Sequence, residues 1–129
     1  MLLSTLKPEQ QETLFHLAHS VVVSDGEFST GERLLMSDMR REMELPETFE
    51  PHYLEAEGME AIFDTPRSRV VCMISLLRLA YADGAFEIEE QGFLGLLCVR
   101  FDISEEGFRR IDHWVRRLIA LTEEVKDLY

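Results

Sequence analysis

Apolar residues recur along this chain at spacings of three and four, which is the period of a helix with one buried face. From Pro8 onward this pattern predicts a first helix that ends near Val23. Ser29 followed by Glu32 reads as a capping box, so we expect a second helix from there to Leu45. The next residue is a proline, which discourages continuation of that helix.

Residues 47–63 are predicted to hold a shorter helix, whose apolar side is Tyr53, Leu54, Met59, Ile62 and Phe63. Thr65 followed by Pro66 is typical of a helix start, with a capping residue before a proline at the first helical position. The helix from Pro66 to Ala82 is apolar on most sides. We therefore expect it to be the central, most buried helix of the fold.

Two further helices are expected in the last third of the chain. One runs from about Ile88 to Phe101, and Ser104 caps a last one. Steps of three and four positions in that last helix join Phe108, Ile111, Val115, Leu118 and Thr122. The alternation of a β-strand is absent throughout. The sequence therefore predicts one all-α domain over residues 1–129, a bundle of five to seven helices.

An internal repeat organises this pattern. The string SDGEFSTGE at positions 24–32 aligns without a gap with ADGAFEIEE at positions 82–90. The matching positions are Asp25, Gly26, Phe28 and Glu32 in the first copy, and Asp83, Gly84, Phe86 and Glu90 in the second. An apolar helix precedes and follows each turn, so we expect two pseudo-repeated helical hairpins on a shared core.

Each residue type in the repeated motif has a physical reason to be there. The glycine can close a helix in the left-handed conformation, and the phenylalanine is expected to turn inward and hold the turn to the core. The glutamate lies in the first turn of the next helix, where a negative charge is favoured. The aspartate can accept hydrogen bonds from the loop.

The motif also resembles the second half of an EF-hand calcium loop. In that register the first and third ligand positions would be Val21 and Val23, or Leu79 and Tyr81 in the second copy. These side chains lack the oxygen ligands that calcium needs there, so neither copy is an EF-hand. Two interpretations stay open for Asp25, Glu32, Asp83 and Glu90. They either only cap and close turns, which is the favoured interpretation, or they pool four carboxylates to bind a divalent cation.

A helix followed by A/S-D-G-x-F-x-x-x-E, repeated in a second hairpin, resembles the TerB-like (tellurite-resistance) family over about residues 8–125. The resemblance implies an all-helical fold, found in tellurite-resistance proteins and in a membrane-anchored DnaJ-type co-chaperone. It also implies that the four acidic turn residues are metal-binding or interaction positions. The two copies differ, since Glu27 corresponds to Ala85 and Gly31 to Glu89. The J-domain is absent, so co-chaperone activity is not carried over.

Composition narrows the class of partner. The net charge is −12, which argues against nucleic acid, because binding to phosphates needs clustered Lys and Arg. An acidic chain attracts cations or a basic partner surface instead. Cys72 and Cys98 stand among apolar residues and are expected to be buried free thiols in a reducing compartment. With no signal peptide and no transmembrane stretch, we expect a cytoplasmic protein.

Other chemistry finds little support in the sequence. His16 and His19 share a helix face and could bind a transition metal with a third ligand, but partly exposed histidines are commoner. Cys72 lies in an apolar helix, which favours a core role over that of a nucleophile. No protease, nucleotide-binding or hydrolase motif is present. Trp114 and Phe108 are expected to be core anchors.

These observations favour a non-enzymatic TerB-like protein of the tellurite or stress-resistance type, acting through a protein partner and through a divalent cation at the acidic turns. One alternative is a metal-dependent enzyme that uses the pooled carboxylates, with His16 or His19. Another is a purely structural interaction domain in which Met36, Met39 and Met43 are exposed as a groove, whereas core packing is the simpler interpretation of these methionines. Homo-oligomerisation and peripheral membrane association stay open.

Overall fold

The computed structural model describes residues 2–23, 29–82 and 88–129, with side chains in the last range described from residue 92. The helices are α1 Pro8–Val23, α2 Thr30–Glu42, α3 Met59–Ile62, α4 Pro66–Ala80, α5 Ile88–Arg100 and α6 Glu105–Glu124, with short 3-10 helices η1 Leu3–Thr5 and η2 Val125–Leu128. No strand occurs in these ranges, so the predicted all-α bundle is confirmed. None of the described helices is long and apolar enough to cross a membrane.

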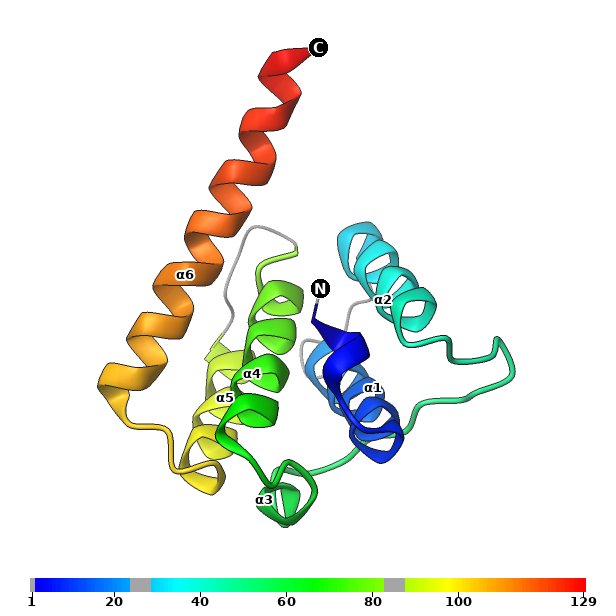
Figure 1. The fold of residues 1–129 in the computed structure, drawn as a ribbon, viewed down its shortest axis with the longest axis vertical. Coiled ribbons are helices and arrows are strands. Elements are labelled where there is room, and N and C mark those ends of the chain that lie inside the picture. The colour runs from blue at the N-terminus through cyan, green and yellow to red at the C-terminus, as the bar shows by residue number, and fades with distance from the viewer. Residues whose placement is uncertain (1, 24–28, 83–87) are drawn as a thin grey trace.

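Helix α4 lies at the centre of the molecule, with α1 on one side and α6 on the other (Figure 1). Its buried residues are Ser68, Val71, Cys72, Met73, Ile74, Ser75, Leu76, Leu77, Leu79 and Ala80. A helix that is apolar nearly all round must be covered on nearly all sides. The predicted central helix is therefore confirmed, and the rest of the fold is built around it.

Local capping sets where α4 begins. The Thr65 hydroxyl accepts a hydrogen bond from the Ser68 backbone N–H at 3.1 Å, and the Ser68 hydroxyl accepts one from the Thr65 N–H at 3.2 Å. Pro66 occupies the first helical turn, where its missing N–H leaves no bond unmade. The predicted restart at Thr65 is thus confirmed.

The internal repeat is visible in the helix boundaries. In the alignment that pairs Asp25 with Asp83, Pro8 at the start of α1 falls on Pro66 at the start of α4, and α2 falls on α5 from first residue to last. The ends of α2 and α5 also match in conformation. Glu44 and Asp102 each have φ of 56°, and the N–H groups of Leu45 and Ile103 bond back to the carbonyls of Arg40 and Cys98. Both helices therefore end in the same left-handed cap.

The predicted helix over residues 47–63 is wrong for most of its length, since only Met59–Ile62 is helical. Pro46 and Pro51 disfavour helical backbone at the residues before them. The segment is instead held by α1: the Leu54 N–H donates to the Ser20 hydroxyl at 2.8 Å, and that hydroxyl donates to the Leu54 carbonyl at 3.0 Å. Hydrogen bonds to another helix replace those within the segment.

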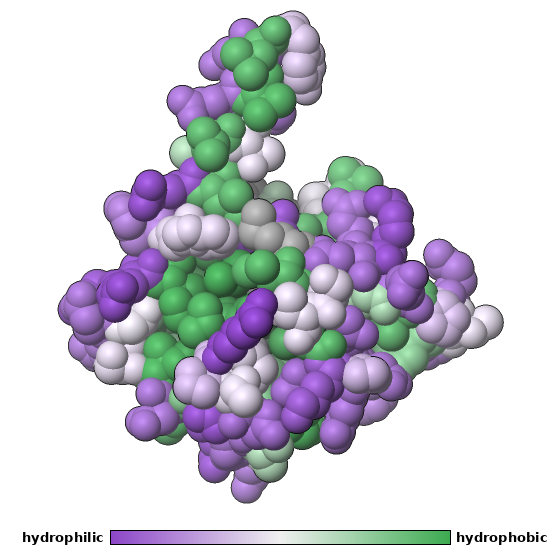
Figure 2. Space-filling view, viewed as in Figure 1, coloured by the Kyte–Doolittle hydropathy of each residue, from purple (hydrophilic) through white to green (hydrophobic). Residues whose placement is uncertain are grey.

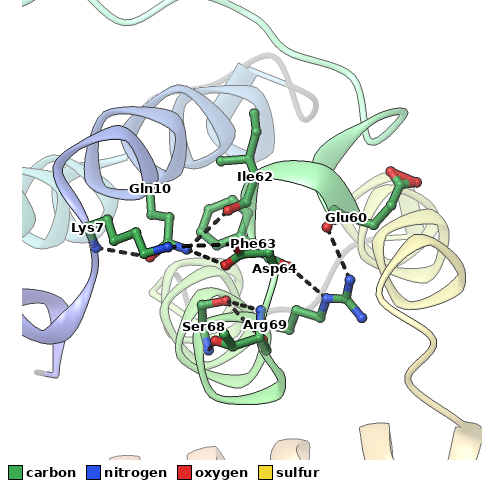
Figure 3. A network of polar contacts seen from close by, with 9 residues as sticks. Lys7, Gln10, Glu60, Ile62, Phe63, Asp64, Ser68 and Arg69 are labelled. Carbon is green, nitrogen blue, oxygen red and sulfur yellow. Dashed lines mark hydrogen bonds and ion pairs between the residues drawn. The ribbon is translucent and has the colours of Figure 1, made fainter.

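A polar network joins α1, α3 and α4 at one end of the bundle (Figure 3), and Arg69 extends it to the residue after α5. The Arg69 guanidinium donates to the carbonyls of Phe63 at 2.7 Å, Glu60 at 3.1 Å and Phe101 at 3.2 Å. The buried Gln10 amide donates to the Ile62 carbonyl at 3.0 Å. Carbonyls at the ends of helices have no partner within the helix. Here Arg69 and Gln10 supply the missing hydrogen-bond partners, and they fix α3 against its neighbours.

Candidate functional site

The predicted acidic site falls mostly on residues without a described position. Asp25 and Asp83 lie outside the described residues, and so does the side chain of Glu90. Glu32 is described, and it is 1% exposed. Its Oε1 accepts from the Ser29 N–H at 3.0 Å, while the Ser29 hydroxyl accepts from the Glu32 N–H at 3.1 Å. The predicted capping box is confirmed, so Glu32 has a structural role at the start of α2.

The described residues that flank the two turns lie against each other. A Cβ added at Gly31, in the first turn of α2, would stand 2.5 Å from the Ala82 carbonyl oxygen, just after α4. That distance is shorter than van der Waals contact, so only glycine fits. The close approach explains why the first copy has Gly31 where the second has Glu89. It also brings the residue before Asp83 beside the helix that carries Glu32.

Within the described part of the chain, the histidines do not form the metal site considered from the sequence. Among the described residues, no group of three His, Cys, Asp or Glu side chains is placed to hold a metal ion. The His16 ring stacks on His52 at 3.9 Å between centroids and lies 5.2 Å from Phe49. Its Nδ1 accepts a hydrogen bond from the His52 backbone N–H at 3.0 Å. His16 therefore ties the segment after α2 to α1.

The environment of His16 disfavours its protonated form. Burial lowers its pKa below the ordinary 6.5, and the neighbouring His52 lowers it further. The bond from the His52 N–H needs a lone pair on Nδ1. The neutral ring is therefore the form that this contact requires.

Both cysteines are buried, as predicted. Desolvation raises the pKa of Cys72 far above its usual range and that of Cys98 to about 11. A nucleophilic cysteine needs a thiolate, which burial in apolar surroundings disfavours. Both thiols serve as core packing.

The structure decides between the two interpretations of the methionines and corrects the expectation for Trp114. Met36, Met39 and Met43 are 6%, 3% and 5% exposed, so the exposed-methionine groove is wrong and the core interpretation holds. Trp114 was expected to be a core anchor, but it is 39% exposed. Phe108 is partly buried and packs against the core, as expected.

Trp114 belongs to an open apolar groove between α4 and α6. The groove has a volume of about 590 Å³, and its apolar lining is Val70 and Ile74 of α4, Ile103 before α6, and Ile111 and Trp114 of α6. Arg110 and Asp102 stand at its edge. Beyond Trp114, the surface continues along α6 over Leu118 and Leu121. Figure 2 shows this apolar surface running from the middle of the molecule up the protruding end of α6.

A second polar cluster holds α6 to the end of α4. The Tyr81 hydroxyl donates to Asp112 Oδ1 at 2.5 Å, and Arg116 Nε donates to Asp112 Oδ2 and to the Tyr81 oxygen, both at 3.0 Å. Burial raises the pKa of Tyr81, and the bond to Asp112 raises it further. With the buried Val115, this cluster fixes the inner face of α6. The outer end of the helix extends past the body of the molecule (Figure 1).

The described residues thus define an all-helical domain with a capped pair of hairpins and an open apolar groove under a protruding helix. Comparison of the chain with protein-family models, curated proteins and solved structures gave no match. The likeness to the TerB-like family is therefore carried by the sequence motif alone.

Substitution at Gly31 tests the close approach of the two turn flanks. We expect Gly31→Ala to lower the free energy of unfolding by about 1–3 kcal/mol, because the new Cβ meets a backbone carbonyl that cannot swing aside. Gly95→Ala in α5 is the matched control. Open space surrounds that position, and alanine there should stabilise the helix by up to about 1 kcal/mol. Urea unfolding followed by circular dichroism gives both values; equal effects would contradict the close approach.

The His16 contact predicts a dependence of stability on pH. The pKa of His16 is lower in the folded than in the unfolded chain, so the unfolded chain binds more protons between the two values. Its contribution to stability is present above pH 6.5 and is lost as pH falls through the folded pKa. We expect His16→Asn, whose amide oxygen can accept the same bond at any pH, to remove this part of the pH dependence in urea unfolding between about pH 8 and 5. An unchanged slope would refute the assignment.

Proposed function

We propose that this chain is a non-catalytic, TerB-like interaction module of the stress-resistance type that binds an amphipathic helix in the α4–α6 groove. The observation that carries the proposal is the exposure of large apolar side chains along one side of α6 and η2. Leu121, Val125 and Leu128 are 62%, 47% and 82% exposed, in line with Trp114. Contiguous apolar surface of this kind marks interaction sites in soluble proteins.

The shape and charge of the groove favour a helix with acidic flanks as the occupant. Two helices, α4 and α6, form the walls, and an amphipathic helix fills such a groove with side chains at spacings of three and four. Arg110 lines the groove itself and Arg117 lines the surface that continues from it, while the acidic lining residues are Asp102, before α6, and Glu124, the last residue of α6. The positive charge of the two arginines complements Glu or Asp beside the apolar stripe of a partner and opposes Lys or Arg there.

Trp114 is the single tryptophan of the chain, so its fluorescence reports on the groove directly. We expect a tryptophan-free synthetic helix with leucine at the contact positions and glutamate beside them to shift the Trp114 emission saturably. The same helix with lysine beside the leucines should bind at least about tenfold more weakly.

Two variants test whether the helix binds in the groove or to any exposed apolar side chain. Val70→Gln, on the α4 wall, should weaken binding of the glutamate helix about tenfold. Leu34→Gln changes a leucine on α2 that is 64% exposed and does not line the groove, so it should leave binding unchanged. The proposal fails when neither helix shifts the emission, or when the two variants weaken binding equally.

A second candidate function is cation binding at the acidic turns. The contact of Gly31 with Ala82 favours it, because the helix that carries Glu32 begins beside the residue preceding Asp83. On this proposal Asp25, Glu32, Asp83 and Glu90 share one divalent cation, whose preferred ligands are oxygen atoms.

Calorimetric titration of calcium, manganese and zinc into chelator-treated protein tests this candidate. We expect saturable binding of one of these ions to the wild-type chain and its loss in Asp25→Asn/Asp83→Asn. The control Glu9→Gln/Glu12→Gln removes the same charge from exposed acids in the first half of α1, and it should bind as the wild type does. Absence of saturable binding in the wild type, or equal loss in both double variants, would remove the cation from the proposal.

A further inference from the structure

We propose that the helix bound in the groove is α6 of a second copy of this chain, in an antiparallel dimer with twofold symmetry. The inference rests on the proposed function, whose partner it names. It is carried by the spacing of the apolar residues left uncovered on α6, by the face that α6 already uses within its own chain, and by two charges that flank the apolar residues.

The exposed and half-buried apolar residues on the outer side of α6 and η2 follow a heptad repeat. We call this set the α6 seam; its members are Ile111, Trp114, Leu118, Leu121, Val125 and Leu128. Successive members are three, four, three, four and three positions apart, which is the spacing of the first and fourth positions of a coiled coil. Such a seam is completed by a second helix that carries the same spacing. A second copy of α6 meets that condition.

Most of the seam lies beside the face that α6 packs against its own domain. That inner face consists of Val115, which is fully buried, of the partly buried Phe108, Ile111 and Ile119, and of the Asp112 and Arg116 cluster with Tyr81. Ile111 belongs to both the inner face and the seam. Only the first two seam residues, Ile111 and Trp114, line the groove next to α4. The later seam residues extend beyond it along the protruding helix (Figure 1). The seam can therefore take a partner without disturbing the fold.

An antiparallel arrangement fits the protruding end of each copy to the groove of the other. In antiparallel coiled coils, first and fourth positions meet in layers. These layers pair Ile111, Trp114 and Leu118 of one copy with Leu128, Val125 and Leu121 of the other. The end of the second α6 then lies against Val70 and Ile74 as well. The most exposed member of the seam, Leu128, enters the groove.

The charges beside the seam select the same arrangement. Arg117 and Glu124 stand one heptad apart on the same edge of α6, and the described residues include no hydrogen bond or ion pair to either. Antiparallel pairing places Arg117 of each copy beside Glu124 of the other, so twofold symmetry creates two ion pairs. Parallel pairing would set Arg117 opposite the uncharged Thr122. It would also bring two chains of net charge −12 side by side at one end.

Sedimentation of the full chain tests the dimer. We expect a species of twice 15.0 kDa at about 100 μM chain, where a dimer with Kd of about 10 μM is mostly formed. Arg117→Glu and Glu124→Arg should each raise the dimer Kd by about tenfold or more, because each replaces two attractions by two repulsions. The double exchange Arg117→Glu/Glu124→Arg should restore the wild-type Kd, since the opposite charges face each other again.

Two further variants distinguish loss of the seam contact between copies from loss of folding. Leu121→Gln should give a monomer with unchanged helix content, since this side chain is largely exposed within one chain. Leu34→Gln should sediment as the wild type. A dimer that survives Leu121→Gln uses another surface and overturns the inference.

Three other outcomes would overturn the inference while leaving different conclusions. A monomeric wild type whose Trp114 still responds to the glutamate-flanked helix keeps the interaction module and rejects the second copy as its partner. A monomer that binds vesicles of anionic phospholipid through the seam rejects the dimer in favour of a membrane surface. Failure of the double exchange to restore the Kd rejects the antiparallel register.

Discussion

The burial of α4 is the constraint on which the rest of this structure depends. A helix with apolar side chains on most of its surface must be covered by others, and here α1, α2, α5 and α6 all contact it. The cover is incomplete beside α6 at Val70, which is 37% exposed. Apolar area left open in this way still gains free energy when it is removed from water. The groove is thus a direct result of the way in which the central helix is enclosed.

The duplication explains both the regularity of the fold and its asymmetry. The hairpins α1–α2 and α4–α5 begin at equivalent residues of the repeat, and their second helices also end at equivalent residues. After them the two copies diverge. The first copy has Pro46 where the second has Ser104, and Pro51 where the second has Arg109. Proline prevents a helix in the first case, whereas serine caps the start of α6 in the second.

Sequence reasoning succeeded where local chemistry decides the outcome. The helix starts at Pro8, at Ser29 with its capping box, and at Thr65 each depend on a few neighbouring residues, and the structure confirms all three. It failed for residues 47–58, because the bonds between Ser20 and Leu54 that hold this segment join distant parts of the chain. Positions of the turn carboxylates Asp25 and Asp83 stay predictions, since both lie outside the described residues.

The groove was missed for a related reason. The sequence showed apolar residues on the last helix, but two apolar stripes share that helix, and only the crossing of α6 over α4 decides which is buried. Val115 belongs to the inner stripe, while Leu121 and Leu128 belong to the outer one. The heptad spacing from Ile111 to Leu128 was the available signal. A stripe of that length exceeds what one crossing of α4 can cover.

The arginine pairs of α6 show how the same helix serves both stripes. Arg116 is bound to Asp112 and Tyr81 on the inner side, whereas its neighbour Arg117 flanks the outer stripe. One heptad earlier, Arg109 pairs with Glu106 while Arg110 lines the groove. The second arginine of each pair falls on the same edge of the helix, because a heptad makes nearly two turns. An acidic chain thereby carries two arginines in succession on the edge of α6 that borders its apolar groove, before Glu124 follows one heptad later.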